Sequence, residues 1–375
     1  MKLGLIAPVD VRRDRRFFSG VGYELHRVLA DRVAVVLLTV PLRRPPLPVR
    51  LYWHTRRRFT RQRYNLDLHP WTVHRQSTQA MRQAAEAGVD VVLAIGQATL
   101  ASWYAPIPAA FFSDTMYGAK FDTYGPWQLS RMDPVQLQQL QEIGQKAIDN
   151  AVAVFVTSRY AFQRAAEFGN ITPPDKQVVT YVGPNFVPPD TLPAPSAFPP
   201  LRLLWVGGSW ERKGGADCVA VADALLAAGV PLELHIVGRK PEDVTRPYLT
   251  FHGYLRKNIT AECEQLAHLY QTCHFLILPT RGDLGPVGLA DAAAMGLPAV
   301  TTNVGGIPDF FPAGEAILIP PEQFGTAAPV AIQQAIDNGA LVSMRHKARE
   351  RYAAALNWDA VADKIVHKLE KVLAA

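Results

Sequence analysis

The stretch LRLLWVGGSWERKGG, residues 201–215, contains the pattern that decides the fold. Its first half is a short apolar run that ends in a glycine pair, and its last glycines open a helical pattern over residues 216–228. Apolar runs of this length favour buried strands, and a glycine turn followed by a helix is typical of a βα unit in a parallel sheet. We therefore predict a strand, a tight loop and a helix in this stretch.

The same alternation of apolar runs and helical patterns extends over the rest of the chain. Strands separated by helices indicate parallel sheets built from βαβ units. The first series of expected strands comprises residues 2–7, 33–40, 89–96, 108–114, 152–158 and 177–183, and the second comprises residues 201–208, 231–238, 274–279, 298–302 and 315–320. The sequence thus predicts an α/β protein with two Rossmann-like sheets in tandem.

A proline-rich segment separates the two series of strands. Residues 183–200 contain seven prolines, which lack a backbone donor and do not fit inside a helix, so this segment reads as a semi-rigid linker. We predict one domain at residues 1–185, the linker at 186–200 and a second domain at 201–355. Residues 356–375 carry apolar side chains at helical spacing and are predicted to form an amphipathic helix that packs back on the body.

The first 75 residues are strongly basic. They contain 16 Lys and Arg against 5 Asp and Glu, whereas the whole chain has a net charge of +6. Such a surface suits anionic lipid or a phosphorylated acceptor, and a solvated basic face is the alternative. No motif of a nucleic-acid-binding domain accompanies the arginines, so we expect no nucleic acid partner. Residues 41–71, rich in Pro and Arg, are expected to form a loop insertion.

No apolar run in the sequence has the length of a signal peptide or a membrane span. We therefore expect a cytoplasmic protein, with peripheral contact to the inner face of the membrane through its basic first domain. The three cysteines, Cys218, Cys263 and Cys273, have no CxxC spacing, so neither a disulfide framework nor a zinc knuckle is expected.

Ligands of open α/β sheets bind beyond the carboxyl ends of the strands, so the loop after residue 206 is a candidate site. This loop, residues 207–215, has four glycines and Lys213, and it opens a helix. Glycine amides, a helix start and a lysine together favour a phosphate or diphosphate. The alternative is a tight turn with Lys213 in solvent. The loop lacks the spacing of a Walker A motif.

A second candidate loop follows residue 279. Pro286 suits the first turn of a helix, and Gly285 allows a ligand close to the backbone. Asp283 therefore precedes a helix start and Asp291 lies about a turn and a half inside the helix. The alternatives are a helix N-cap for Asp283 and an exposed helix position for Asp291. Residues 303–309 follow the next strand and add a further glycine pair.

The first domain offers weaker signals. A glycine loop that includes Gly20 and Gly22 opens a helix, and Asp114 ends a strand, although a turn or cap aspartate is equally consistent with its position. No acid ends the second strand, so a dinucleotide cofactor is disfavoured. The sequence shows no cluster with metal spacing and no GxSxG motif, so neither a metal nor a serine hydrolase mechanism is expected.

In this order, the motifs resemble those of a GT-B fold glycosyltransferase, most similar to glycosyltransferase family 4. The resemblance covers nearly the whole chain and is most specific in its second half. It rests on the glycine loop at residues 19–22, Ser-Asp114, residues 150–159 and 179–185, Trp-Glu-Arg-Lys-Gly214, His-Ile-Val-Gly238 and Ala-Met-Gly-Leu-Pro298. It implies two Rossmann-like domains whose parallel sheets face each other across a cleft, with the acceptor on the N-terminal side and the nucleotide sugar on the C-terminal side.

The resemblance also implies roles for particular residues. The family has two glutamates eight residues apart before Ala-x-x-x-Gly-x-Pro, and this chain has Asp283 and Asp291 at those positions. The first acid of the family and the adjacent loop hold the donor sugar, and the second acid binds the ribose. By the same comparison Lys213 contacts the diphosphate and stabilises charge on the departing nucleotide, and Asp114 lies near the sugar and the acceptor, where it accepts the acceptor's proton or holds a hydroxyl. Asp114, Asp283 and Lys213 are thus the implied catalytic residues. The remaining implied substrate-binding residues are Gly20, Gly208, Ser209, Arg212, Leu284, Gly285 and Pro286.

Three of these positions depart from the family. Asp283 and Asp291 are shorter than the family's glutamates, and Gly208 stands where an arginine usually accompanies the lysine, a role that Arg212 is a candidate to fill.

The implied function is a retaining, metal-independent hexosyltransferase that needs no cofactor. It would move a sugar from a nucleotide diphosphate donor to a glycan, a lipid-linked molecule or a small molecule, in polysaccharide or glycoconjugate biosynthesis. A non-catalytic protein that binds a nucleotide sugar or a glycan is the alternative, and a nucleotide-sugar epimerase on the same fold is a third interpretation.

Overall fold

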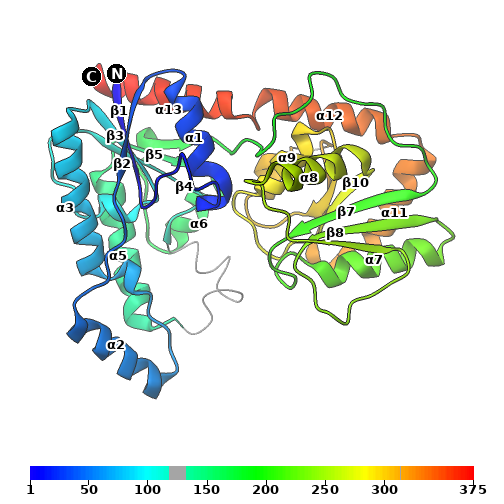
Figure 1. Ribbon diagram of the computed structural model, residues 1–375, viewed down its shortest axis with the longest axis horizontal. Helices are drawn as coiled ribbons and strands as arrows, with labels where there is room; N and C mark the ends of the chain where they lie inside the picture. The colour runs from blue at the N-terminus through cyan, green and yellow to red at the C-terminus, as the bar shows by residue number, and fades with distance from the viewer. Residues whose placement is uncertain (118–131, 313) are drawn as a thin grey trace. The chain divides into compact units, whose positions relative to one another are not determined.

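The computed structural model describes residues 1–117, 132–312 and 314–375 (Figure 1). The chain forms two compact units, one made of residues 1–181 and 358–375 and the other of residues 182–357. Each unit has a parallel sheet with helices packed on it.

The sheet of the first unit has the strand order β2-β1-β3-β4-β5-β6, and all neighbours pair in parallel. The strands are short and almost wholly apolar, as expected where helices cover both faces of a sheet. Their bounds are β1 Lys2–Ala7, β2 Ala34–Thr39, β3 Val91–Ile95, β4 Ala109–Ser113, β5 Ala153–Val156 and β6 Gln177–Val179.

Most helices of the first unit bury an apolar side against the rest of the unit. They are α1 Val21–Ala30, α2 Leu47–Thr60, α3 Pro70–Ala87, α5 Pro134–Asn150, α6 Arg159–Glu167 and α13 Trp358–Leu373. Helices α3 and α5 share one core with the sheet. The C-terminal helix α13 packs against α1, and Arg32 forms ion pairs with its Asp359 and Asp363 at 2.9 and 2.7 Å.

The expected loop insertion at residues 41–71 is wrong, because residues 47–60 form the helix α2. Pro48 lies in the first turn of α2, where a missing N–H costs no intrahelical hydrogen bond. Residues 49–60 contain neither Gly nor Pro, so nothing interrupts the helix once it has begun. A short 3-10 helix, Leu66–Leu68, leads from there into α3.

The sheet of the second unit has the order β12-β11-β10-β7-β8-β9, again with parallel neighbours. Its strands are β7 Leu201–Gly207, β8 Leu232–Gly238, β9 Leu249–Gly253, β10 Phe275–Leu278, β11 Ala299–Thr302 and β12 Ile317–Ile319. The edge strand β9 was not expected. Its side chains are half-buried or exposed, so it lacks the apolar run that marks the other strands.

The helices of the second unit are α7 Gly215–Ala227, α8 Thr260–Thr272, α9 Val287–Ala294, α10 Ile307–Phe310, α11 Phe324–Asp337 and α12 Leu341–Ala354. Helices α7 and α11 lie together on one side of this sheet, and α8 and α9 lie on the other (Figure 1). The Pro-rich segment runs along this unit, where Arg349 and Arg345 donate hydrogen bonds to the carbonyls of Pro189 and Pro193 at 2.8 and 3.0 Å.

No helix in the described parts of the chain is both long enough and apolar enough to cross a membrane. The three cysteines are unbridged, and Cys218 and Cys273 are buried.

Candidate functional site

The glycine loop after β7, residues 207–215, leaves its backbone accessible at Gly208. At Gly208 an added Cβ would meet no atom within 4 Å, so this position faces open space. At Gly207 and Gly238 an added Cβ would lie 2.6 Å from the Trp205 ring and 1.9 Å from the Gly207 carbonyl, so neither position has room for a side chain. A hydrogen bond from Lys213 N–H to the Ser209 carbonyl at 3.0 Å closes a turn in the loop, and α7 begins directly after it at Gly215.

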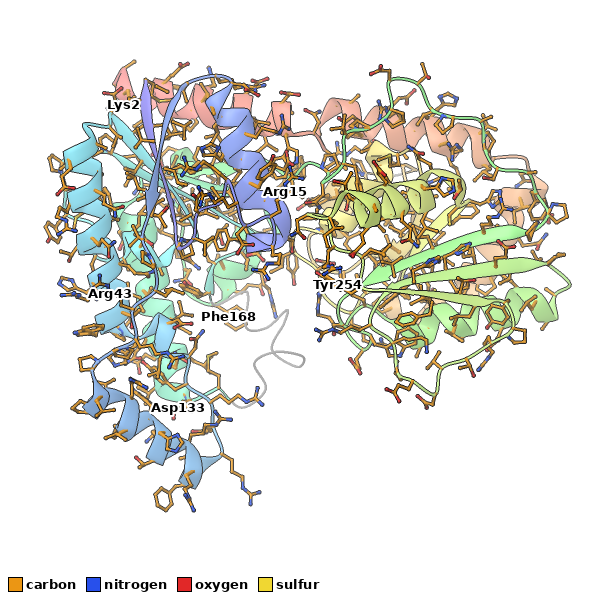
Figure 2. All side chains as sticks on the ribbon, viewed as in Figure 1. Lys2, Arg15, Arg43, Asp133, Phe168 and Tyr254 are labelled. Atoms are coloured by element: carbon orange, nitrogen blue, oxygen red, sulfur yellow. The ribbon has the colours of Figure 1, made fainter. Side chains whose placement is uncertain are left out.

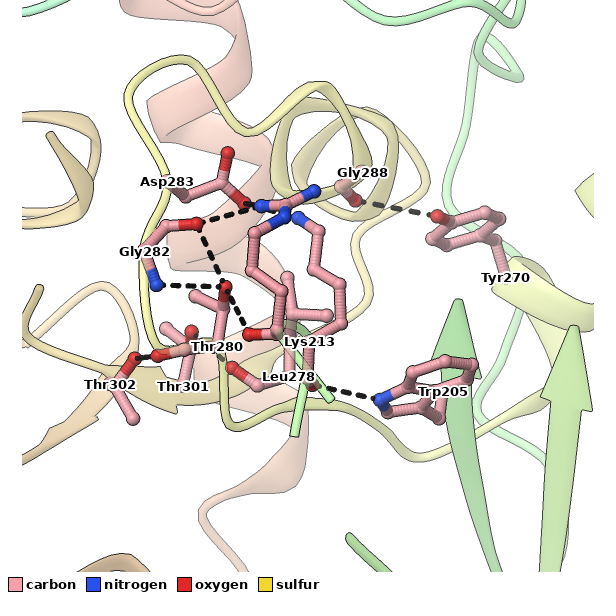
Figure 3. A network of polar contacts seen from close by, with 11 residues as sticks. Trp205, Lys213, Tyr270, Leu278, Thr280, Gly282, Asp283, Gly288, Thr301 and Thr302 are labelled. Atoms are coloured by element: carbon pink, nitrogen blue, oxygen red, sulfur yellow. Dashed lines mark hydrogen bonds and ion pairs between the residues drawn. The ribbon is translucent and has the colours of Figure 1, made fainter. Parts of the chain in front are cut away.

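The loop after β10 is tied to the glycine loop, because β10 and β7 are neighbours in the sheet. The Arg212 guanidinium donates to the Gly282 carbonyl at 2.7 Å, and the N–H of Arg281 donates to the Arg212 carbonyl at 2.7 Å. Thr280 and Thr302 continue this network, with the Thr302 hydroxyl donating to the Thr280 carbonyl at 2.5 Å (Figure 3). The two loops therefore form one connected site.

An ion pair between Lys213 and Asp283 lies at the centre of this network (Figure 3). Arg212 adds a second positive charge 4.0 Å from the same carboxylate. The side chains of Lys213 and Asp283 are 14% and 7% exposed, so the alternative of a lysine in solvent is wrong. Burial lowers the pKa of Lys213, and the charge of Asp283 opposes that shift.

Asp283 is not the N-cap of the following helix. The residue before the first turn of α9 is Pro286, and no side chain caps this helix. The carbonyl of Asp283 accepts a hydrogen bond from Gly306 N–H at 2.9 Å, so the glycine pair after β11 supports this loop. Of the other predicted donor-binding residues, Leu284 and Pro286 are buried and Gly285 is half-buried.

Asp291 lies inside α9 with no exposed surface, so the alternative of an exposed helix position is wrong. Its Oδ1 accepts a hydrogen bond from Asn185 N–H at 2.6 Å, and its Oδ2 lies 2.9 Å from the Lys257 ammonium. Burial, with the charge of Asp291 as a second cause, raises the pKa of Tyr270 well above its usual value. Both oxygens of Asp291 therefore already have protein partners.

Sequence reasoning did not single out Lys257 or the amide of Asn185. Lys257 precedes α8 in a loop without a motif, and only the folded chain brings it to Asp291. The Lys257 ammonium also lies 5.5 Å from the centre of the Phe186 ring.

Two predicted residues, Gly20 and Asp114, belong to the first unit. Gly20 has φ +93 and precedes α1, after Phe18 and Ser19 with φ of 51 and 57. Asp114 follows β4, and its carbonyl accepts a hydrogen bond from the Thr157 hydroxyl at 3.2 Å. The second unit brings Gly208, Ser209, Arg212, Lys213 and Asp283 together without these two. Across residues 1–117, 132–312 and 314–375, no group of three or more His, Cys, Asp or Glu could hold a metal ion.

Comparison with known proteins finds a family match in the second unit. Residues 200–338 match the family model described as "Glycosyl transferases group 1". A curated protein of Salmonella typhimurium, "Putative colanic acid biosynthesis glycosyltransferase WcaL", is 27% identical over 212 residues, which are 53% of this chain and 52% of that protein. The chain therefore spans about half the length of the curated relative that it matches.

Solved structures resemble the whole chain at low sequence identity. A sucrose-phosphate synthase from Thermosynechococcus elongatus has a TM-score of 0.68 and 18% identity, with 100% of this chain and 99% of that chain covered. The Anabaena protein Alr3699/HepE, in a complex with UDP, has a TM-score of 0.61 and 16% identity, with 99% of each chain covered.

The chain thus has the GT-B fold, with two units that each carry a parallel sheet. The family match lies within its second unit.

Proposed function

We propose that this protein is a glycosyltransferase that takes its sugar from a nucleotide diphosphate donor. The observation that carries the proposal is the pair of linked loops after β7 and β10, with Lys213 and Arg212 beside Asp283 and open space at Gly208. The family match over residues 200–338 supports it, as do the structures of Alr3699/HepE with UDP and with UDP-glucose.

In this proposal, the diphosphate binds at the glycine loop and the start of α7, where backbone N–H groups and the helix dipole favour negative charge. Lys213 and Arg212 stabilise the charge that develops on the departing nucleotide, a contribution that is often the largest in such reactions. Asp283 turns from its ion pair to a hydroxyl of the donor sugar. Two cations that lie together in the protein supply positive charge without a metal, so the proposed mechanism is metal-independent.

Asp291 is proposed to bind the ribose by exchanging a protein partner for the nucleotide. One oxygen keeps the Asn185 amide, and the ribose hydroxyls replace Lys257 at the other oxygen. This assignment makes Lys257 a neighbour of the ribose site, although no motif in the sequence pointed to it.

The remaining parts of the proposal concern the reaction and its acceptor. Transfer is proposed to retain the configuration of the sugar, with the departing phosphate accepting the proton of the acceptor hydroxyl. Asp114 of the first unit is proposed to hold an acceptor hydroxyl in position by a hydrogen bond, while the phosphate takes the proton. The acceptor is a glycan, a lipid-linked molecule or a small molecule, and the name of the Salmonella relative supports a role in polysaccharide biosynthesis.

The proposal is tested in two stages. Thermal denaturation with UDP, GDP and a panel of nucleotide sugars identifies the donor, because a ligand that binds only the native state raises its stability. Release of free nucleotide from that donor is then measured with a panel of acceptors. Binding without nucleotide release would support a non-catalytic binding protein, and sugar interconversion without an acceptor would support an epimerase.

A further inference from the structure

Helix α2 of the first unit exposes a row of large apolar side chains. Leu47, Leu51 and Phe59 are 59%, 54% and 85% exposed, and Tyr52 beside Leu51 is 56% exposed. Residues four apart are neighbours on a helix surface, so Leu47, Leu51, Thr55 and Phe59 form a continuous row that winds about a third of the way around the helix. The Thr55 hydroxyl donates to the Leu51 carbonyl at 3.0 Å, so this polar member of the row is satisfied within the helix.

The opposite side of α2 is firmly attached to the first unit. Trp53 is buried and stacks on Tyr64, with ring centres 3.5 Å apart and planes at 20°. Arg56 donates from Nε to Asp133 at 2.5 Å, and Asp133 is the buried N-cap of α5. Figure 2 shows Asp133 beside α2. These contacts fix the orientation of α2 about its own axis, and this orientation directs the apolar row toward solvent.

The same segment is strongly cationic. Residues 41–63 contain eight arginines and no Asp or Glu. Arg43 and Arg44 are exposed on the stretch that leads into α2, and Arg57 and Arg58 are exposed on the helix itself. In Figure 1, α2 lies at the end of the first unit opposite the two chain termini. An exposed apolar row bordered by arginines is typical of helices that lie in the headgroup region of a membrane.

We infer that α2 and residues 41–46 form a docking surface for an anionic lipid bilayer. Leu47, Leu51, Tyr52 and Phe59 enter the boundary between headgroups and acyl chains, and the arginines bind lipid phosphates. A purely polyanionic partner, such as a nucleic acid, would use the arginines and leave the apolar row in water. The inference does not rest on the proposed transfer reaction, because lipid binding is measured without a donor or an acceptor.

Co-sedimentation of the full chain with vesicles tests this surface. The vesicles are phosphatidylcholine alone, or equal parts of phosphatidylcholine and phosphatidylglycerol, at low and at high salt. We expect binding only to the anionic vesicles and a strong reduction at high salt, because the Debye length falls from about 10 Å at 0.1 M to about 3 Å at 1 M. No binding to anionic vesicles at low salt would overturn the inference.

Two variants of α2 separate its apolar and cationic contributions. Leu51→Ser/Phe59→Ser and Arg57→Glu/Arg58→Glu should each weaken binding to anionic vesicles about tenfold or more, because the first removes apolar surface and the second reverses two charges at the bilayer. The matched controls lie elsewhere on the first unit. Tyr104→Ser removes a side chain that is 72% exposed, and Arg13→Glu/Arg82→Glu makes the same change in charge; both should bind as the wild type does.

The melting temperature of each variant is measured as well. It should equal that of the wild type, because all the substituted side chains are largely exposed. If Leu51→Ser/Phe59→Ser binds vesicles normally, the surface recognises only negative charge and the lipid assignment is wrong. If Arg13→Glu/Arg82→Glu weakens binding as much as Arg57→Glu/Arg58→Glu, net charge and not α2 is responsible, and the inference also fails.

Discussion

The Lys257 ammonium lies 2.9 Å from Oδ2 of Asp291, a carboxylate with no exposed surface in the second unit. The Asn185 amide donates to the other oxygen at 2.6 Å. One buried charge therefore joins the start of the Pro-rich segment, the loop before α8 and helix α9. A buried ion has to be paired and hydrogen-bonded, because removal from water costs several kcal/mol.

This pair predicts opposite effects of two substitutions on nucleotide affinity. Asp291→Ala should weaken the binding of UDP or GDP whatever sugar is attached, because the proposed ribose ligand is lost. Lys257→Met leaves the carboxylate in place and removes the cation that the ribose has to displace, so nucleotide affinity should be unchanged or higher. Isothermal titration with the free nucleotide measures both. Equal affinity of wild type and Asp291→Ala would refute the ribose role.

Stability provides the control for these two variants. Asp291→Ala should lower the free energy of unfolding by about 1–3 kcal/mol, since the Asn185 N–H loses its carboxylate acceptor and Lys257 loses its ion pair. Lys257→Met should also be destabilising, because it strands the buried carboxylate. Urea denaturation of each variant checks that both remain folded at the temperature of the titration.

Lys213 is predicted to act mainly on turnover. Lys213→Met should lower kcat about a hundredfold or more and change donor affinity less, because its charge stabilises the departing nucleotide more than the bound donor. Steady-state kinetics with the identified donor separate the two effects. Lys347→Met, at an exposed position on α12, is the matched control and should keep full activity. A loss of affinity without a loss of kcat would contradict the catalytic role.

Gly305 is predicted to be required for the position of the Asp283 loop. It has φ +58, and an added Cβ would lie 2.1 Å from the Asp283 carbonyl. Gly339 has φ +63 with no atom within 4 Å, so Gly339→Ala measures the backbone cost alone, which is about 1–2 kcal/mol. Gly305→Ala should lower the melting temperature further and weaken donor binding. If the two variants behave alike, the loop tolerates the displacement of Asp283.

The strands of both sheets could be predicted because burial on two faces leaves a continuous apolar run in the sequence. The exposed edge strand β9 leaves no such run, and it was missed. Helix α2 was missed for a different reason, because its prolines and arginines resemble those of a loop. What holds it in place is the contact of Trp53 with Tyr64 and of Arg56 with Asp133, and these partners depend on the tertiary fold.

The donor site was predictable to the extent that its residues follow strands. Lys213 and Asp283 follow β7 and β10, and the carboxyl ends of parallel strands meet at one edge of a sheet. The order of the strands makes them neighbours, and no local pattern specifies that order. Lys257 follows β9, the edge strand that has no apolar run and was itself missed, so nothing in its neighbourhood along the chain pointed to Asp291.

Asp133 is predicted to stabilise the first unit by two separate contacts. It accepts a hydrogen bond from Val135 N–H at 3.0 Å as the N-cap of α5, and it pairs with Arg56 of α2. Asp133→Ala should lower the free energy of unfolding by about 2–3 kcal/mol, since a cap contributes about 1 kcal/mol and the buried pair adds to it. Hydrogen exchange should also accelerate in α2. Asp149→Ala, at the exposed C-terminal end of α5, should have a small effect on both.

The histidine pair at the edge of the second sheet predicts a pH dependence of stability. His235 Nδ1 and His252 Nε2 are 3.1 Å apart on β8 and β9, with Glu233, Arg202 and Gln265 as their polar and charged neighbours. Burial lowers the pKa of both rings, and for His235 the charge of His252 lowers it further.

Because the folded pKa of each ring is below the unfolded value of about 6.5, the unfolded chain binds protons first as the pH falls. The stability contributed by the neutral rings is therefore complete above the unfolded pKa and is lost as the pH falls through the folded pKa. His252→Gln should flatten the decline of the urea midpoint below about pH 6.5. His346→Gln, at an exposed position on α12, should retain the slope of the wild type. An unchanged slope in His252→Gln would mean that the pair is solvated in the native state and that other groups set the acid response.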